Sequence, residues 1–224
     1  SGNGAFRLGP DSFDHYTLCD GLGQNNARGT LVEADGPVWV ATITHPTDGG
    51  GGISRFDGSS WNTVVSADGV ALGDIIELAL ATDGSVWMTH AASGGGLTRY
   101  DGNQFVNFQR PGGAGPNQLW RLAIAPDGAI WVTSQGNGVG VFDAAGNWLR
   151  DFTTADGLVT NSTRGIAVGA SGDVWVGTIQ GVQRWDNADW ELLDASDGLI
   201  SNQTGAMRVD PAGILWVGTA AGLS

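Results

Sequence analysis

The sequence has no lysine, only one cysteine and three histidines, and no apolar run approaching the roughly 20 residues that a membrane helix needs. The single cysteine, Cys19, excludes an internal disulfide and a zinc site built on thiolates. Its strand-like surroundings favour a buried, inert thiol. The formal net charge of −13 argues against nucleic acid and against an anionic membrane surface, because both attract clustered cations. We therefore expect no nucleic-acid partner and no membrane insertion.

Glycine and tryptophan are abundant instead, with 38 and 10 copies in 224 residues. Glycine is costly inside helices but favourable in turns that need a positive φ. No window shows helical periodicity for longer than about two turns. The composition therefore predicts an all-β protein with many short strands and tight turns.

Five tryptophans stand in near-identical settings, each with one glycine three positions earlier and another eighteen positions earlier. They are Trp39, Trp87, Trp131, Trp175 and Trp216. Successive members are 48, 44, 44 and 41 residues apart, and the interval from Trp216 through the two chain ends to Trp39 is 47. A repeat of this length with four short strands is typical of a propeller blade. The sequence predicts a single domain over 1–224, a five-bladed β-propeller with four antiparallel strands per blade.

The fourth repeat shows the expected strands most clearly, at 164–168, 174–178, 181–185 and 190–193. The segment 1–22 resembles the second half of a repeat. We therefore expect it to complete the blade begun at 203–224, so that N- and C-terminal strands close the ring and hide its edges. We also expect a monomer. We also expect the five tryptophans to pack between blades and the repeated asparagines, Asn25, Asn117, Asn161 and Asn202, to brace loops.

One motif set identifies a family. It consists of Asp197-Gly198-Leu199, Asn202, Leu215-Trp216-Val217-Gly218-Thr219 and Gly222-Leu223, and it recurs nearly complete between Asp156 and Val182. This pattern resembles the two-component regulator propeller repeat over essentially the whole chain. The resemblance implies an extracytoplasmic, periplasmic or secreted, module that senses ligands such as oligosaccharides.

Residues that break the repeat are the candidates for function, because the fold does not require them. Near the start of the strand expected to line the central channel, the exceptions are Arg28, Glu77, Trp120, Arg121, Arg164 and Arg208. His45 and His90 are expected on the same loop-bearing side. Arginine offers a planar fork to carboxylates, and tryptophan offers an apolar face to a sugar ring. These residues predict a ligand site for a saccharide or an anionic small molecule.

The alternative for these residues is structural: Glu77 pairs with Arg121 of the adjacent blade, and the other arginines cap loop carbonyls. Catalysis has little support, since most aspartates occupy turn positions and no metal-ligand spacing is present. We therefore expect no enzyme, no cofactor and no metal. Two other functions remain open: a protein-interaction scaffold that uses the glycine-rich segment 43–52, and a polysaccharide lyase or hydrolase with Glu77 as its acid or base.

Overall fold

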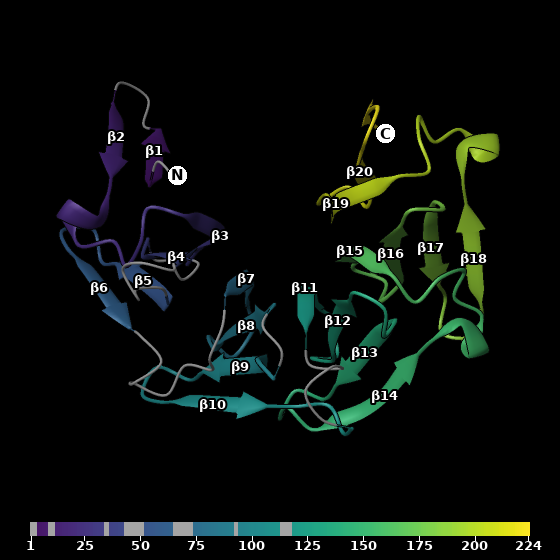
Figure 1. Ribbon diagram of the computed structural model, residues 1–224, viewed down its shortest axis with the longest axis horizontal. Helices are drawn as coiled ribbons and strands as arrows, with labels where there is room; N and C mark the ends of the chain where they lie inside the picture. Colours follow the sequence, from purple (N-terminus) through teal and green to yellow (C-terminus); the bar gives the residue numbers. More distant parts are fainter. Residues whose placement is uncertain are drawn as a thin grey trace.

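The computed structural model describes residues 4–8, 12–33, 36–42, 52–64, 74–91, 94–112 and 118–224. These residues form short antiparallel sheets arranged as blades around a central axis (Figure 1). The predicted all-β, five-bladed propeller is confirmed. No helix in the described part of the chain has the length and apolarity that a membrane crossing requires.

The first four repeats each form a four-stranded sheet in which consecutive strands are neighbours. The first blade contains β3 (Ala27–Val32), β4 (Val38–Thr42), β5 (Gly52–Phe56) and β6 (Trp61–Val64). The second contains β7 (Ile75–Leu80), β8 (Val86–His90), β9 (Gly96–Tyr100) and β10 (Phe105–Phe108). The third contains β11 (Leu119–Ile124), β12 (Ile130–Ser134), β13 (Val139–Phe142) and β14 (Trp148–Phe152).

The fourth blade contains β15 (Thr163–Val168), β16 (Val174–Thr178), β17 (Val182–Trp185) and β18 (Trp190–Leu193). These bounds match the predicted strands to within one residue at each end. The first strand of every blade lies innermost and the fourth lies at the periphery (Figure 1). Neighbouring inner strands pack closely: a Cβ atom on Gly165 of β15 would overlap the carbonyl oxygen of Gly205 in the next blade. Small residues on the inner strands are therefore a packing requirement.

The two chain ends lie in separate sheets. In the fifth repeat, β19 (Thr204–Val209), β20 (Leu215–Thr219) and β21 (Gly222–Leu223) form a three-stranded sheet. A separate two-stranded sheet contains β1 (Ala5–Leu8) and β2 (Phe13–Tyr16). Figure 1 shows these two sheets on opposite sides of an opening in the ring. Among the described residues, the N- and C-terminal strands are therefore not hydrogen-bonded into one sheet, and their predicted union in one blade stays a prediction.

The repeat tryptophans fill the interfaces between blades. Trp39, Trp87 and Trp131 are 3%, 1% and 8% exposed, and Trp175 is half-buried. Trp131 belongs to one hydrophobic cluster with Ile166, Val174 and Val176 of the fourth blade. Trp216, by contrast, is 45% exposed, because no described residue forms a blade beyond it. The predicted inter-blade role is therefore confirmed for Trp39, Trp87 and Trp131, while for Trp216 it stays a prediction.

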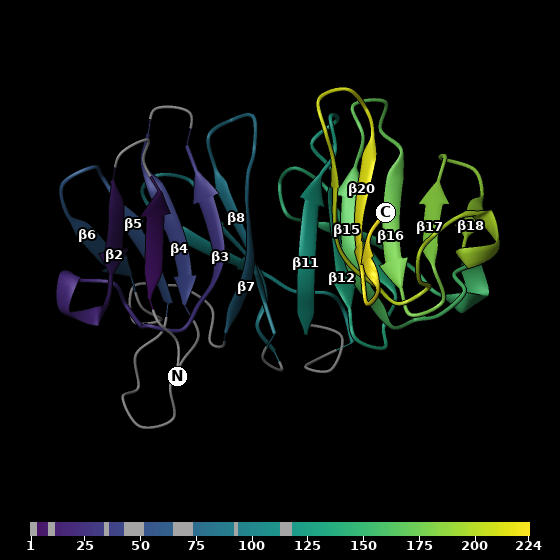
Figure 2. The ribbon, with the colours of Figure 1, turned by 90° about the horizontal axis from the view of Figure 1, so that it is seen from above.

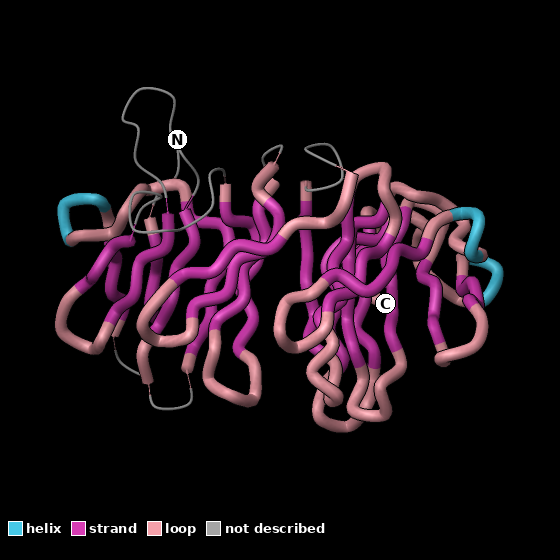
Figure 3. The backbone as a smooth tube through the Cα atoms, turned by 90° about the horizontal axis from the view of Figure 1, so that it is seen from below, coloured by secondary structure: helices cyan, strands magenta, loops and turns pink. Residues whose placement is uncertain are grey.

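Three links between blades contain the same short 3-10 turn, and the fourth-blade link shows why its residues recur. Asp156 accepts a hydrogen bond from the Thr153 backbone at 2.9 Å, and Gly157 adopts a left-handed φ of 99° that ends the turn. Asn161 Oδ1 accepts from the Thr154 backbone at 2.8 Å. The three turns are η1 (Leu18–Asp20), η4 (Thr154–Asp156) and η5 (Ala195–Asp197). They lie near one face of the ring (Figure 3).

The same asparagine contact recurs at 2.8 Å from the Leu18 backbone to Asn25 and at 2.7 Å from the Ala195 backbone to Asn202. The predicted loop-bracing role is confirmed for these residues, while Asn117 lies outside the described residues. Cys19 is exposed in η1. The prediction of a buried thiol is wrong, because this segment forms a surface turn and not a strand.

Candidate functional site

Every inner strand carries a register irregularity near its start, at the position where the repeat-breaking residues stand. The shifts lie between Ala27 and Thr30, Ile75 and Glu77, Leu119 and Leu122, Thr163 and Gly165, and Thr204 and Met207. Such bulges re-aim side chains and are frequent beside functional sites. Since all five blades have the irregularity, its position belongs to the fold. The side chains at that position differ between blades, so they are available to contact a ligand.

A pocket opens where β11, β15 and β19 begin, on the loop-bearing face of the channel. Its volume is about 350 Å³ and its lining includes Trp120, Arg121, Gln135, Ser162, Arg164 and Ala206. We call it the channel-mouth pocket. The volume falls within the range of small-molecule sites. Inner strands run through the thickness of the ring, so their first residues lie at the mouth (Figure 2).

Two hydrogen bonds hold the backbone of the β11 bulge. The Thr89 hydroxyl donates to the Trp120 carbonyl at 3.0 Å, and the Arg121 backbone donates to the Thr133 hydroxyl at 3.1 Å. The Trp120 side chain is nevertheless 36% exposed, although three other tryptophans of the chain are buried. A fixed backbone with an exposed indole presents a flat apolar surface on which a ring can stack.

Arg121 is paired with Glu77 across the boundary between the second and third blades. Arg121 Nη1 lies 2.5 Å from Glu77 Oε2, and both side chains are partly exposed. This confirms the pairing predicted as the structural alternative. Both residues also border a second hollow of about 200 Å³ further along the channel wall, with Gly165 and Met207. The pairing offsets the charge of Arg121, so Arg121 brings little net charge to the pocket.

Four arginines differ from the rest in having no carboxylate partner in the described parts of the chain. The paired arginines are Arg55, Arg99, Arg110, Arg121, Arg150 and Arg184. The unpaired ones are Arg7, Arg28, Arg164 and Arg208, and none caps a carbonyl of a described residue. With 23 acidic residues in the chain, a cation without a carboxylate is unexpected. Of the four, Arg164 lies in the channel-mouth pocket beside Trp120.

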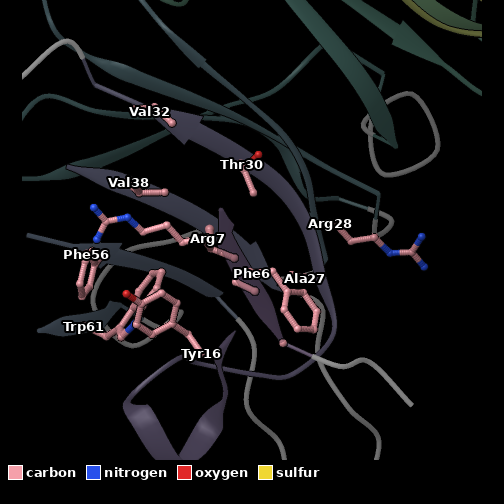
Figure 4. Close-up of a pocket in the computed structure, with 13 residues that line it drawn as sticks. Phe6, Arg7, Tyr16, Ala27, Arg28, Thr30, Val32, Val38, Phe56 and Trp61 are labelled. Carbon is pink, nitrogen blue, oxygen red and sulfur yellow. The ribbon is translucent and has the colours of Figure 1, made fainter. Parts of the chain in front are cut away.

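The structure does not gather all the predicted site residues. Arg208 is exposed on β19 but lines neither channel hollow. Arg28 belongs to β3 at the opposite end of the arc, beside a different hollow, and its side chain extends away from that hollow (Figure 4). His45 and the glycine-rich segment 43–51 lie outside the described residues. The assembled group is Glu77, Trp120, Arg121 and Arg164.

His90 lies inside the second blade and not at the channel mouth. It is fully buried, and its Nε2 atom is 2.8 Å from the Thr98 hydroxyl. That hydroxyl in turn donates to Asn107 Oδ1 at 2.6 Å. Because a hydroxyl has one proton, His90 Nε2 is the donor in this chain of hydrogen bonds. His90 therefore links three strands of its own blade, and its predicted place in the ligand site is wrong.

Gln135 and Ser162 are pocket residues that the sequence did not single out. Gln135 lies in the loop after β12 and Ser162 just before β15, and a β-bridge joins them. Their only sequence signal is that each lies next to an expected strand on the loop-bearing side, Gln135 after one strand and Ser162 before another. Both bring polar groups to the lining of the pocket that also contains Trp120.

The aspartates with shifted pKa values occupy turns. Backbone hydrogen bonds from Gln104 and Asn103 hold the pKa of Asp101 below its ordinary value of 3.8. Backbone donors from Ser60 and Ser59 likewise hold the pKa of Asp57 far below that value. None of these carboxyls lines the channel-mouth pocket. Within the described residues, no group of three or more histidine, cysteine or acidic side chains is placed to hold a metal.

No family model and no curated protein matches the sequence. Solved structures do match. The extracellular domain of BT3049 from B. thetaiotaomicron, described as a hybrid two component system, is 18% identical with a TM-score of 0.75 and covers 94% of this chain and 30% of its own. The extracellular domain of BT4673 from the same organism is 16% identical with a TM-score of 0.74, and the match covers 94% of this chain and 32% of that domain. Virginiamycin B lyase from Staphylococcus aureus is 16% identical with a TM-score of 0.69, and the match covers 89% of this chain and 69% of the lyase.

The chain thus spans about a third of the length of the two extracellular domains. Likeness at these identities shows the fold alone. It confirms, at the level of fold, the predicted resemblance to propellers of two-component regulators. Since extracellular domains and an enzyme both share the fold, function must be argued from the pocket itself.

Proposed function

We propose that this chain is a non-catalytic, extracytoplasmic ligand-binding or sensing propeller module. Its ligand is an acidic saccharide or another anionic small molecule with a flat apolar face, and it binds in the channel-mouth pocket. The extracytoplasmic placement is supported by the extracellular neighbours BT3049 and BT4673. The observation that carries the proposal is an unpaired arginine, Arg164, beside an exposed indole, Trp120, in one pocket.

The charge balance of the pocket favours an anion. Glu77 offsets Arg121, so Arg164 supplies the net positive charge. A guanidinium without a protein carboxylate binds a ligand carboxylate through two parallel hydrogen bonds, and such charged bonds are stronger than neutral ones. In a protein of net charge −13, the surrounding surface repels anions, so binding depends on this local cation.

The indole defines the rest of the ligand. Trp120 offers an apolar face at the same pocket, with Gln135 and Ser162 as neutral hydrogen-bonding groups at its edge. A pyranose ring has an apolar face and a rim of hydroxyls, which matches this division. A uronic acid carries both that ring and a carboxylate, and it is the simplest molecule that uses every element of the pocket.

The test is calorimetric titration with oligomers of galacturonic acid and with galactose oligomers of equal length. We expect heat from the acidic series, with affinity that falls as salt rises. Arg164→Gln should weaken acidic binding by about 10- to 100-fold, the equivalent of losing a charged hydrogen bond. Trp120→Ala should weaken the acidic and neutral series alike.

The matched control is Arg150→Gln, which removes an arginine of the same blade as Trp120 on the outer strand β14. It should leave all affinities unchanged. Absence of heat across the acidic series, or an Arg164→Gln variant that binds as tightly as the parent, refutes the proposal.

A lyase or hydrolase is the second candidate, supported by the likeness to virginiamycin B lyase. Glu77 is an acidic side chain that contacts the pocket residue Arg121. If the chain is a lyase, an acidic polysaccharide should yield an unsaturated product that absorbs in the ultraviolet, and Glu77→Gln should abolish it. Turnover that survives Glu77→Gln excludes this residue as the acid or base.

A further inference from the structure

The hollow of about 200 Å³ further along the channel wall adjoins the channel-mouth pocket. We call it the inner hollow. Arg121 and Ala206 line both spaces. Trp120 lines the mouth, and Leu122, two positions further along β11, lines the inner hollow. Two residues of a strand span about 7 Å, which is on the scale of one pyranose unit. The two spaces are therefore placed to hold neighbouring units of one oligosaccharide.

One level of the inner strands shapes the inner hollow. Ten positions before each repeat tryptophan, the five blades carry in order Gly29, Glu77, Arg121, Gly165 and Ala206. Three blades place only a hydrogen atom or a methyl group at this level, whereas the second and third blades place long charged side chains. Packing accounts for Gly165, since a Cβ atom there would overlap the next blade. Packing does not require a carboxylate and a guanidinium group at the same level.

The pair formed by Glu77 and Arg121 keeps hydrogen-bonding groups available. Arg121 Nη1 donates to Glu77 Oε2 at 2.5 Å. Among the described residues, Glu77 Oε1 and Arg121 Nη2 have no hydrogen-bond partner. The two side chains are 33% and 37% exposed, and both line the inner hollow. The pair thus offers one acceptor and one donor side by side to a molecule in that space.

Arginine pairs elsewhere in the blades have a structural task that this one lacks. The guanidinium carbons of Arg55, Arg99 and Arg184 lie 5.5, 5.8 and 5.5 Å from the ring centroids of the repeat tryptophans in their blades. At these distances each arginine makes a cation–π contact in addition to its ion pair. Within the part of the chain that the structure describes, Arg121 covers no aromatic ring.

The chemistry of the inner hollow suits an uncharged sugar unit. Neighbouring hydroxyls of a pyranose can donate to Glu77 Oε1 and accept from Arg121 Nη2 at once, and hydrogen bonds to charged groups are stronger than neutral ones. Leu122, Ile166 and Met207 give the hollow an apolar side for the C–H face of the ring. A second uronic acid suits it poorly, because its carboxylate would face the Glu77 carboxylate in a partly buried space.

From these two adjoining spaces we propose that the ligand is a mixed disaccharide unit, with a uronic acid in the channel-mouth pocket and an uncharged sugar in the inner hollow. Trp120 and Arg164 hold the acid, and Glu77 and Arg121 bind the hydroxyls of its neutral neighbour. The assignment of the inner hollow rests on the proposed function and adds to it the second sugar and a ligand contact for Glu77. Polysaccharides that join acidic and neutral units are then better ligands than polymers of uronic acid alone.

A purely structural pair between the second and third blades predicts a different result from a pair that contacts the ligand. If Glu77 only positions Arg121, removing its charge changes the affinity for every uronic acid ligand by the same factor. If Glu77 contacts the second sugar, the same change weakens binding of the mixed disaccharide relative to a single uronic acid. It also strengthens binding of a disaccharide of two uronic acids, because the repulsion between carboxylates is removed.

The experiment is calorimetric titration at about pH 7, where these carboxyl groups are ionised, and at constant salt. The ligands are galacturonic acid, digalacturonic acid and the two mixed disaccharides, galacturonosyl-galactose and galactosyl-galacturonic acid. One mixed isomer should bind about tenfold more tightly than galacturonic acid and than digalacturonic acid, the equivalent of one added hydrogen bond to a charged group. The selectivity of the parent chain tests the proposal without any variant.

Glu77→Gln tests the residue itself. Replacing a charged acceptor by a neutral one should lower the affinity for the preferred mixed isomer about fivefold relative to galacturonic acid, and digalacturonic acid should bind more tightly than to the parent. The matched control is Glu33→Gln, the same substitution at a glutamate that pairs with Arg55 at 3.1 Å and lines neither channel space. This control should leave the affinity ratios unchanged, and circular dichroism should show the parent fold for both variants.

The outcomes separate the two proposals. If no uronic acid ligand gives heat, the proposed function and the inner-hollow assignment are both refuted. If galacturonic acid binds but neither mixed isomer binds more tightly, only the inner-hollow assignment is overturned. The same conclusion follows if Glu77→Gln changes the affinities for all four ligands by one common factor.

Discussion

Replacing the repeat tryptophans one at a time should have unequal effects on stability, although the sequence presents them as equivalent. Trp87 is 1% exposed and Trp216 is 45% exposed. A tryptophan buries about 150–250 Å² when fully enclosed. At about 25 cal/mol per Å², this area is worth about 4–6 kcal/mol as an upper bound. Trp87→Ala should therefore lower the free energy of unfolding by about 4 kcal/mol, within the observed range for buried aromatics.

Trp216→Ala removes only about half of that buried area, so its cost should be about 2 kcal/mol on the same scale. Since a domain of this kind has a net stability of about 5–15 kcal/mol, the first variant should be strongly destabilised and the second should remain folded. The difference of about 2 kcal/mol follows from the unequal exposure of the two side chains.

The measurement is urea unfolding followed by circular dichroism, with free energies from linear extrapolation. The protein must be dilute, so that association between copies does not add stability to the parent. Trp148→Ala serves as the reference for loss of a partly exposed tryptophan away from the arc ends. Equal losses for Trp87→Ala and Trp216→Ala would refute unequal exposure as the basis of this reasoning.

Three further predictions concern charged residues. Glu77→Gln removes the carboxylate that pairs with Arg121, so the affinity for an anionic oligosaccharide should rise severalfold in calorimetry. A fall in affinity would show that Glu77 itself contacts the ligand. Arg110 is buried and pairs with Asp151, so Arg110→Met should cost about 3 kcal/mol in urea unfolding, and a loss near zero would contradict the pairing. Hydrogen bonds hold the pKa of turn aspartates such as Asp101 below 3.8, so their contribution is present above the unfolded-state pKa and is lost as pH falls through the folded-state pKa. The urea midpoint should be flat above about pH 5 and fall below about pH 4, and Asp101→Ala should reduce that fall.

The candidate site was predicted in part. Sequence register identified Trp120, Arg121, Arg164 and Glu77 as residues that the repeat does not require, and the structure places them around the channel mouth. Register says which strand position a residue holds but not whether a carboxylate lies beside it. That Arg121 is paired while Arg164 is not depends on contacts between blades about forty residues apart.

His90 shows the same limit from the other side. It departs from the repeat, as the site residues do, yet it is buried among strands of its own blade and bonded to Thr98. A residue that departs from the repeat is not required by the fold of every blade, but it can still pack inside its own blade, as His90 does. Only the burial of the side chain separates these cases.

The sequence by itself determined the features that depend on neighbours in the chain: the blades, the strand bounds of the fourth repeat, and the Asp-Gly-Leu turns with their asparagine brace. Each needs only a few consecutive residues, so each is visible in the repeat. Only the tertiary structure decided how the blades lie around the axis, because that arrangement depends on contacts between residues about forty positions apart. The exposure of each repeat tryptophan was decided at this level as well: Trp87 is 1% exposed and Trp216 is 45% exposed, although both stand in the same repeat motif.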